Sequence, residues 1–214
     1  MDVYLFCNTG YGIPFIRSLC RFAPAGIRLN RTIVLSSRTP LSLPRRLSRR
    51  LKLLWALRQL RTGCRIVFTH DVNSSNFTQC IPAEAIGIVG GFNQIFRTQA
   101  IQRFGSLINV HPSVLPLYRG AIPSYWCIRN RETMTGFTLH RITESIDSGE
   151  VLYQEYTRIQ PDDTEATLDR RIANQAAPVL MRYLLSLATG QLFSRKLLQT
   201  PYQNSINYAP AKRV

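Results

Sequence analysis

The stretch from Leu107 to Gly149 reads LINVHPSVLPLYRGAIPSYWCIRNRETMTGFTLHRITESIDSG. Its opening apolar run, LINV, has the length of a buried strand, and the proline after His111 ends that strand because proline cannot extend a ladder. Asn109 and His111 are two residues apart, so a strand projects both side chains to one side. Asp147 follows a second apolar-alternating strand, in a turn-forming string. The stretch therefore predicts an amide, an imidazole and a carboxylate together at strand ends, where ligands collect in open parallel sheets.

Each of these residues also has an ordinary structural explanation. A single histidine after a strand is commonly a buried structural residue, and Asn or Asp before a turn commonly forms that turn. The spacing of all three together marks them as a candidate site. His140, in the middle of the second strand, is predicted to be structural, and His70, in a polar loop, has no assigned role.

The rest of the chain alternates short apolar runs with helical patterns. Strands are predicted at 3–7, 32–36, 64–69, 85–90, 107–110, 137–142 and 151–159, and helices at 14–22, 45–61, 123–131 and from Asp163-Thr164 to Gly190. The last helix has an apolar face formed by Leu168, Ile172, Leu180, Tyr183 and Leu187. This alternation predicts an α/β fold with a mainly parallel, twisted, Rossmann-like sheet flanked by helices. We expect one domain over residues 1–190 and a short C-terminal extension over 191–214.

Charge and composition limit the classes of function. The 214-residue chain is 45% hydrophobic and 18% charged, which is ordinary for a globular protein, but its formal net charge is +15. Such a charge attracts nucleic acid, anionic lipid or phosphorylated small molecules, so nucleic acid stays open as a partner. Much of the charge lies in the predicted helix 45–61, where a solvated face is the ordinary explanation.

The same sequence predicts a cytoplasmic protein without a metal. No apolar run approaches ~20 residues, so no membrane span is expected, and the N-terminus lacks the pattern of a signal peptide. The five cysteines are odd in number and form no CxxC pair, which favours buried free thiols in a reducing compartment. Three histidines make a multi-histidine metal centre improbable.

The order of motifs resembles the folate-dependent formyltransferases, a superfamily that includes methionyl-tRNA formyltransferase, glycinamide ribonucleotide transformylase and the nucleotide-sugar N-formyltransferases. The resemblance extends from about Val3 to Ile159. It rests on Asn109 to Pro116, Tyr118-Arg119-Gly120, Pro123, Trp126, Thr135-Gly136, His140 and Ile146 to Gly149.

This resemblance implies roles for particular residues, with N10-formyltetrahydrofolate as cosubstrate and no metal. The residues implied to be catalytic are Asn109, His111 and Asp147. Those implied to contact the folate are Phe92, Asn93, Gln94, Ile95, Phe96, Ser113, Val114, Leu115, Pro116 and Ile146. Those implied to contact the amine substrate are Asn8, Tyr11, Gly12, Tyr118, Arg119 and Gly120.

The resemblance leaves three interpretations of the acceptor open. The first is the amino group of a nucleotide-linked 4-amino-4,6-dideoxy sugar, favoured because only residues 191–214 follow the last predicted helix. The second is an aminoacyl-tRNA or another amine. The third is a non-catalytic module of the same fold that binds nucleic acid or a membrane through its basic helix. Small-molecule substrates and a homodimer are the expected partners under the first interpretation.

Overall fold

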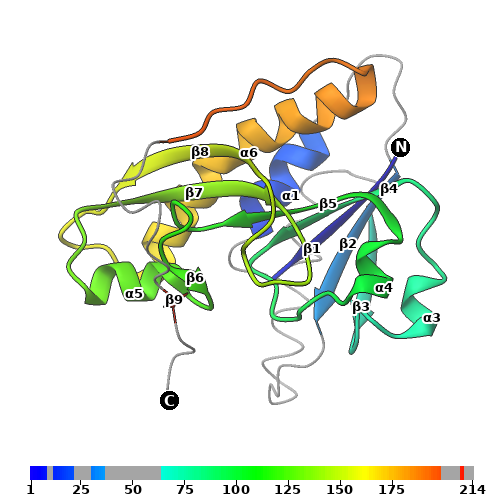
Figure 1. The fold of residues 1–214 in the computed structure, drawn as a ribbon, viewed down its shortest axis with the longest axis horizontal. Coiled ribbons are helices and arrows are strands. Elements are labelled where there is room, and N and C mark those ends of the chain that lie inside the picture. Colours follow the sequence, from blue (N-terminus) through cyan, green and yellow to red (C-terminus); the bar gives the residue numbers. More distant parts are fainter. Residues whose placement is uncertain (9–11, 22–29, 37–63, 199–207, 210–214) are drawn as a thin grey trace. The chain divides into compact units, whose positions relative to one another are not determined.

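The computed structural model describes residues 1–8, 12–21, 30–36, 64–198 and 208–209 (Figure 1). These residues form an α/β fold in which strands and helices alternate, as the sequence predicts. The predicted basic helix at 45–61 lies outside the described residues. The chain divides into two compact units, Met1–Leu107 and Ile108–Val214.

The first unit is built on parallel strands. It contains β1 (Asp2–Cys7), α1 (Gly12–Arg21), β2 (Asn30–Ser36), β3 (Arg65–Thr69), α3 (Ser75–Thr78), β4 (Ala85–Gly90), α4 (Thr98–Ile101) and the start of β5 (Phe104–His111). The strand β1 pairs in parallel with both β2 and β4, and β2 pairs in parallel with β3. All six residues of β4 are buried, which explains why its sequence is a continuous apolar run rather than an alternating one.

An aromatic cluster forms part of the core of this unit. Phe6 of β1 is fully buried, and its ring makes edge-to-face contacts with Phe77, Phe96 and Phe104 at centroid distances of 6.1, 5.0 and 5.8 Å. Edge-to-face contacts at these distances stabilise a core beyond the area that they bury. The cluster thus joins β1 to α3, to β5 and to the loop after β4.

The second unit is built on antiparallel strands. It contains the end of β5, β6 (Arg119–Gly120), α5 (Pro123–Arg129), β7 (Met134–Arg141), β8 (Val151–Arg158), α6 (Glu165–Thr189) and β9 (Tyr208–Ala209). The strand β7 pairs antiparallel with β5 and with β8, while β6 and β9 form a separate parallel pair. Through β5, the hydrogen-bonded order of the main sheet is β3-β2-β1-β4-β5-β7-β8, a mixed sheet with an antiparallel end.

The long helix α6 begins and ends where the sequence predicts. The Thr164 side chain accepts a hydrogen bond from the Thr167 N–H in a capping box, and Gly190 ends the helix at φ 69°. Four of the five predicted inner-face residues are buried, but Leu187 is 40% exposed, so its predicted burial is wrong. In the last two turns the buried side instead runs through Leu184 and Ser186.

The described cysteines differ in their burial. Among the described residues Cys7, Cys64, Cys80 and Cys127 are free thiols, and of these Cys7 and Cys127 are buried while Cys80 is exposed. Within the same residues, no helix is both long and apolar enough to cross a membrane.

Candidate active site

The end of β5 and the loop after β7 bring the three predicted residues together in the second unit. Asn109 and His111 lie on β5, and the Asp147 loop connects β7 to β8. One carboxylate oxygen of Asp147 lies 3.4 Å from the Asn109 amide nitrogen, and the other lies 3.4 Å from His111 Nδ1. An amide, an imidazole and a carboxylate thus converge, as the strand period and the turn signal predict.

The loop that carries Asp147 depends on two backbone features. Asp147 adopts a left-handed conformation at φ 47°, which aspartate tolerates better than most residues. Gly149 lies so close to the end of β7 that a Cβ there would be 1.9 Å from the carbonyl oxygen of Arg141. Only glycine fits at this position without moving the strand, which explains the Asp-Ser-Gly sequence of the turn.

The segment Tyr118–Gly120, which we call the clamp segment, contacts both ends of the His111–Asp147 pair. His111 Nε2 donates a hydrogen bond of 2.8 Å to the Tyr118 carbonyl oxygen. The backbone N–H of Gly120 donates one of 2.8 Å to Asp147 Oδ2. Tyr118 at φ 55° and Gly120 at φ 99° both have positive φ. Because the Tyr118 carbonyl accepts the hydrogen of Nε2, the clamp segment fixes Nδ1 as the nitrogen of His111 that faces the carboxylate.

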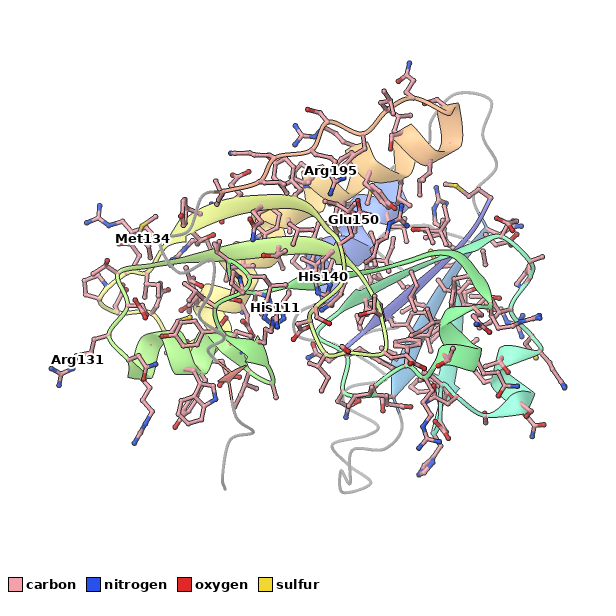
Figure 2. All side chains as sticks on the ribbon, viewed as in Figure 1. His111, Arg131, Met134, His140, Glu150 and Arg195 are labelled. Carbon is pink, nitrogen blue, oxygen red and sulfur yellow. The ribbon has the colours of Figure 1, made fainter. Side chains whose placement is uncertain are left out.

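His140 of β7 is a fourth member of the cluster, and the sequence-based prediction that it is only structural misses this (Figure 2). It is directly opposite Asn109 in the strand pairing. Its Nδ1 lies 2.9 Å from the Arg141 carbonyl oxygen, and its Nε2 lies 3.2 Å from the Asn109 amide nitrogen and 3.5 Å from Asp147 Oδ1. Because a carbonyl oxygen only accepts, Nδ1 of His140 carries the hydrogen toward Arg141, and Nε2 is placed to accept the Asn109 amide hydrogen.

Burial and charge act in opposite directions on the titratable groups. Burial lowers the pKa of His111, and the charge of Asp147 opposes that shift. Burial alone would raise the pKa of Asp147, but the neighbouring His140 and His111 side chains and the Gly120 N–H together lower it to about 2. Asp147 is consequently a carboxylate at neutral pH, and His111 tends to be neutral.

This geometry suits proton transfer and the stabilisation of a developing negative charge. The Nε2–H of His111 is committed to Tyr118, so Nδ1 is the basic nitrogen and it faces Asp147. The contacts of 3.4 Å from Asp147 to Asn109 and His111 are long for hydrogen bonds, so a ligand can replace them at little cost. Catalytic hydrogen bonds are often long in ligand-free proteins and shorten in the complex.

The first predicted folate segment, Phe92–Phe96, lies in the first unit, and its residues divide into two groups. Gln94 and Phe96 are buried, whereas Asn93 and Ile95 are exposed, Ile95 by 63%. The Gln94 side chain accepts a hydrogen bond from the Val72 N–H and donates one to the Ser36 hydroxyl. Gln94 and Phe96 thus hold the loop in place, and Asn93 and Ile95 are the side chains that a ligand can reach.

The second predicted folate segment, Ser113–Pro116, is an internal support of the second unit. Ser113, Val114 and Leu115 are buried. The Thr138 hydroxyl donates to the Ser113 carbonyl and accepts from the Leu115 N–H, at 2.7 and 2.9 Å. The Leu115–Pro116 peptide bond is cis. Direct contact between this segment and a folate stays a prediction, as it does for Ile146, which is 51% exposed.

The predicted amine-binding residues are placed differently from one another. Tyr118 is buried, and its hydroxyl donates to Glu132 at 2.6 Å, so its side chain is part of the core. Arg119 is partly buried, near enough to lower the pKa of His111, and its Nε has no hydrogen-bond partner in the described structure. Gly120 contributes its backbone N–H to Asp147.

The remaining predicted amine-binding residues follow β1 in the first unit. Asn8 is exposed, and Gly12 packs so tightly that a Cβ would lie 2.4 Å from the Cys7 sulfur. Tyr11 lies outside the described residues. Over the described ranges, no group of three or more His, Cys, Asp or Glu side chains is arranged to hold a metal ion.

Comparison with known proteins relates this site to one family. A family model described as formyl transferase matches residues 69–184. The chain is 37% identical over 126 residues to a methionyl-tRNA formyltransferase of Syntrophus aciditrophicus (strain SB), a match that covers 58% of this chain and 38% of the relative. For a methionyl-tRNA formyltransferase of Solibacter usitatus (strain Ellin6076) the identity is 39% over 121 residues, or 56% and 39% of the two chains. The matches span about two-fifths of the length of these relatives.

Solved structures share the fold at lower sequence identity. A sugar N-formyltransferase from Shewanella sp FDAARGOS_354 has a TM-score of 0.68 and 22% identity, with 98% of this chain and 76% of that chain covered. The glycinamide ribonucleotide transformylase 1 from Symbiobacterium toebii has a TM-score of 0.65 and 18% identity, with 92% and 93% covered. These likenesses establish the α/β fold with its mixed sheet, whichever acceptor each protein uses.

Proposed function

Because the chain belongs to the formyl transferase family, we propose that it transfers a formyl group from N10-formyltetrahydrofolate to a primary amine. The observation that carries the proposal is the convergence of Asn109 and His111 on Asp147, each at 3.4 Å. These are the residues for which the family resemblance implies catalytic roles. Their side chains supply a hydrogen-bond donor that never titrates and an acid–base pair.

The reaction is an acyl transfer with a balanced movement of one proton. The amine nitrogen bonds to the formyl carbon, the bond from that carbon to the folate nitrogen breaks, and one proton passes from the amine to the departing nitrogen. Asn109 donates its amide hydrogen to the carbonyl oxygen as negative charge develops there. One rigid donor of this kind contributes about 2.7–4 kcal/mol to catalysis.

The His111–Asp147 pair receives the proton. His111 Nδ1 is the free basic nitrogen, and Asp147 Oδ2, 3.4 Å away, stabilises the imidazolium that forms there. The lowered pKa of His111 keeps the ring neutral and ready to accept a proton near pH 7. General acid–base catalysis by such a group typically contributes roughly 10²- to 10⁴-fold in rate.

The first candidate for the acceptor is an aminoacyl-tRNA. Relatives with 37% and 39% identity carry the name methionyl-tRNA formyltransferase, and the net charge of +15 suits a polyanionic substrate. The nucleotide-linked amino sugar expected from the sequence is less well supported. The Arg119 Nε, which has no hydrogen-bond partner in the described structure, suits a phosphate in either acceptor.

One assay tests both the reaction and the acceptor. The protein is mixed with N10-formyltetrahydrofolate and either methionyl-tRNA or a panel of dTDP-, UDP- and GDP-linked amino sugars, and the release of tetrahydrofolate is followed. We expect turnover with the tRNA, with binding that weakens steeply as salt rises because counterions are released. Turnover only with a sugar would identify the acceptor as a nucleotide-linked amino sugar. If none of the amines tested caused release of tetrahydrofolate, the proposal would be contradicted.

The proposed roles predict the behaviour of two variants. His111→Ala and Asp147→Asn should each reduce turnover by at least about 100-fold, because acid–base catalysis contributes that much. Folate binding, followed by fluorescence quenching, should change little. The matched control is His70→Ala, which removes an exposed histidine of the first unit. Near-normal turnover in either site variant would show that the roles are assigned wrongly.

A further inference from the structure

The end of the described chain returns to the clamp segment. In the second unit, β9 pairs in parallel with β6, with Tyr208 opposite Arg119 and Ala209 opposite Gly120 (Figure 1). The strand β6 is the last two-thirds of the clamp segment. The strand β9 begins 61 residues after Asp147 in the sequence. In the fold, it nevertheless pairs with the backbone that contacts this carboxylate.

The clamp segment needs such support. Its carbonyl at Tyr118 and its N–H at Gly120 hold His111 and Asp147, each at 2.8 Å. Tyr118 and the nearby Ile122 have φ of 55° and 52°, a left-handed conformation that costs roughly 1–2 kcal/mol for such residues. Strained backbone of this kind persists only where surrounding structure holds it. Pairing with β9 is an interaction of the right kind, because it fixes the backbone itself.

Residues 196–198 are anchored separately, on β8. The Gln154 N–H of β8 donates to the Lys196 carbonyl at 2.7 Å, and the Leu198 N–H donates to the Gln154 side chain at 3.2 Å. Lys196 also forms a parallel bridge with Tyr153. A chain that ends at Leu198 would thus keep these contacts while lacking β9. This makes the contribution of β9 separable by experiment.

We infer that β9 is a positioning element of the active site, which holds the clamp segment so that His111 and Asp147 keep their mutual orientation. The inference rests on the proposed function for its catalytic consequence. Without β9 the clamp segment can relax, His111 Nε2 loses a fixed acceptor and Asp147 loses a fixed donor. In a fraction of the molecules, the basic nitrogen of His111 then turns away from the carboxylate.

The test compares a chain that ends at Leu198 with one that ends at Pro210. Both retain the anchors on β8, and only the longer one retains β9. We expect the shorter chain to lose about 10- to 100-fold in kcat, because small misplacements of catalytic groups have effects of that size. The KM for N10-formyltetrahydrofolate should stay within about twofold, since the oriented pair serves the reaction step rather than uniform binding.

A second variant leaves the chain at full length. Ala209→Pro removes a backbone N–H from β9 and restricts its φ, which weakens strand pairing. It should reproduce the loss in kcat, while the control Leu192→Pro, at a fully exposed position before the anchors, should not. If the shorter chain fails to fold, this variant decides. If Ala209→Pro also fails to fold, β9 is a general stability element and the inference is overturned.

A measurement without catalysis separates this inference from the proposed function. In protein labelled with ¹⁵N-histidine, the His111 Nε2–H should give a slowly exchanging NMR signal in the Pro210 chain. That signal should exchange faster in the Leu198 chain. Unchanged kcat and unchanged exchange would overturn the role of β9. If no amine is formylated by any chain, the proposed function fails, and the exchange measurement still decides whether β9 holds the pair.

Discussion

At the scale of single residues, four nitrogen atoms of different kinds surround the carboxylate of Asp147. Asn109 and His140 face one carboxylate oxygen at 3.4 and 3.5 Å, while His111 and the Gly120 N–H face the other at 3.4 and 2.8 Å. Only the contact from Gly120 has the length of a strong hydrogen bond. The backbone therefore fixes the carboxylate, and the side chains remain able to turn toward a substrate.

The contacts of His140 predict that it acts through Asn109. Replacement of His140 by Leu removes the acceptor for the Asn109 amide hydrogen, so the amide loses its fixed orientation. We expect a loss in kcat of roughly 10-fold, below the effect of removing the oxyanion donor itself, and a KM for the folate that changes little. Steady-state kinetics with both substrates measures this split.

Two comparisons make that prediction specific. His140→Gln keeps an acceptor and should restore part of kcat, while His70→Leu, at the exposed histidine of the first unit, should have no effect. A purely structural His140 would lower the melting temperature and leave kcat of the folded fraction intact. Equal kcat in the Leu and Gln variants would contradict the role in orienting Asn109.

The predictable part of the site is the part that local sequence specifies. Asn109 and His111 share a strand face, and Asp147 needs a turn, so spacing and turn chemistry indicate all three. His140 and the Gly120 N–H depend on strand register and on a chain reversal, which no local pattern specifies. The pairing that places His140 opposite Asn109 joins two strands about 30 residues apart, so it exists only in the folded sheet.

At the scale of elements, α5 and α6 meet at the partly buried carboxylate of Asp169. The Ser124 hydroxyl donates to Asp169 Oδ1 at 2.5 Å. Burial raises the pKa of Asp169 to about 6, with a further contribution from the charge of Glu165 and an opposing one from the Ser124 hydrogen bond. The folded protein consequently binds a proton at Asp169 more tightly than the unfolded chain does.

This raised pKa predicts that Asp169→Asn stabilises the protein at neutral pH. The pKa of the folded state exceeds the ordinary 3.8, so ionisation of Asp169 lowers stability as pH rises from about 4 to 6. The asparagine keeps an acceptor for Ser124 without the charge. We expect a gain of about 1–3 kcal/mol in the free energy of unfolding at pH 7, measured by urea titration.

The pH dependence of that gain is the control. It should disappear near pH 4, where Asp169 is protonated and resembles the amide. Asp169→Ala, which leaves the Ser124 hydroxyl without its acceptor, should gain less. If Asp169→Asn were no more stable than the original chain at pH 7, other groups in the folded protein would have to compensate the charge of Asp169.

The elements themselves were predictable in proportion to their length and local signals. The helix α6 has a capping Thr164 and a terminal Gly190, and β4 is a clean apolar run, so the sequence predicts both within a residue. The short elements α3, α4, β6 and β9 carry no such signal. The pairing of β6 with β9 joins residues about 90 positions apart, and only tertiary structure determines it.

At the scale of the whole molecule, the sequence predicts the α/β class but not the division of the described chain into two units. The first unit has parallel strands, and the second has antiparallel strands. The change occurs within β5, whose apolar sequence is compatible with either pairing. The mainly parallel character is confirmed, and the antiparallel end is where Asn109, His111 and Asp147 lie.

Three titratable groups with shifted pKa values, Asp147, His111 and Asp169, contribute to how the stability of the protein depends on pH. Asp147 has a folded pKa of about 2, below the ordinary 3.8, so it contributes about 2 kcal/mol above pH 4, and this is lost as pH falls toward 2. His111 has a lowered pKa and is neutral when folded, so its contribution is lost as pH falls below 6.5. Asp169 acts with the opposite sign and gains stability as pH falls from about 6 to 4.

These opposing signs predict a shallow dependence of stability between pH 7 and 4, where His111 and Asp169 offset each other, and a steep loss below pH 4. Urea unfolding at pH 7, 4 and 2 measures this, and Asp147→Asn should flatten the steep part. A wild-type chain as stable at pH 2 as at pH 4 would contradict the assignment of an ionised, hydrogen-bonded Asp147, because Asp169 has completed its gain in stability by about pH 4 and no longer offsets the protonation of Asp147.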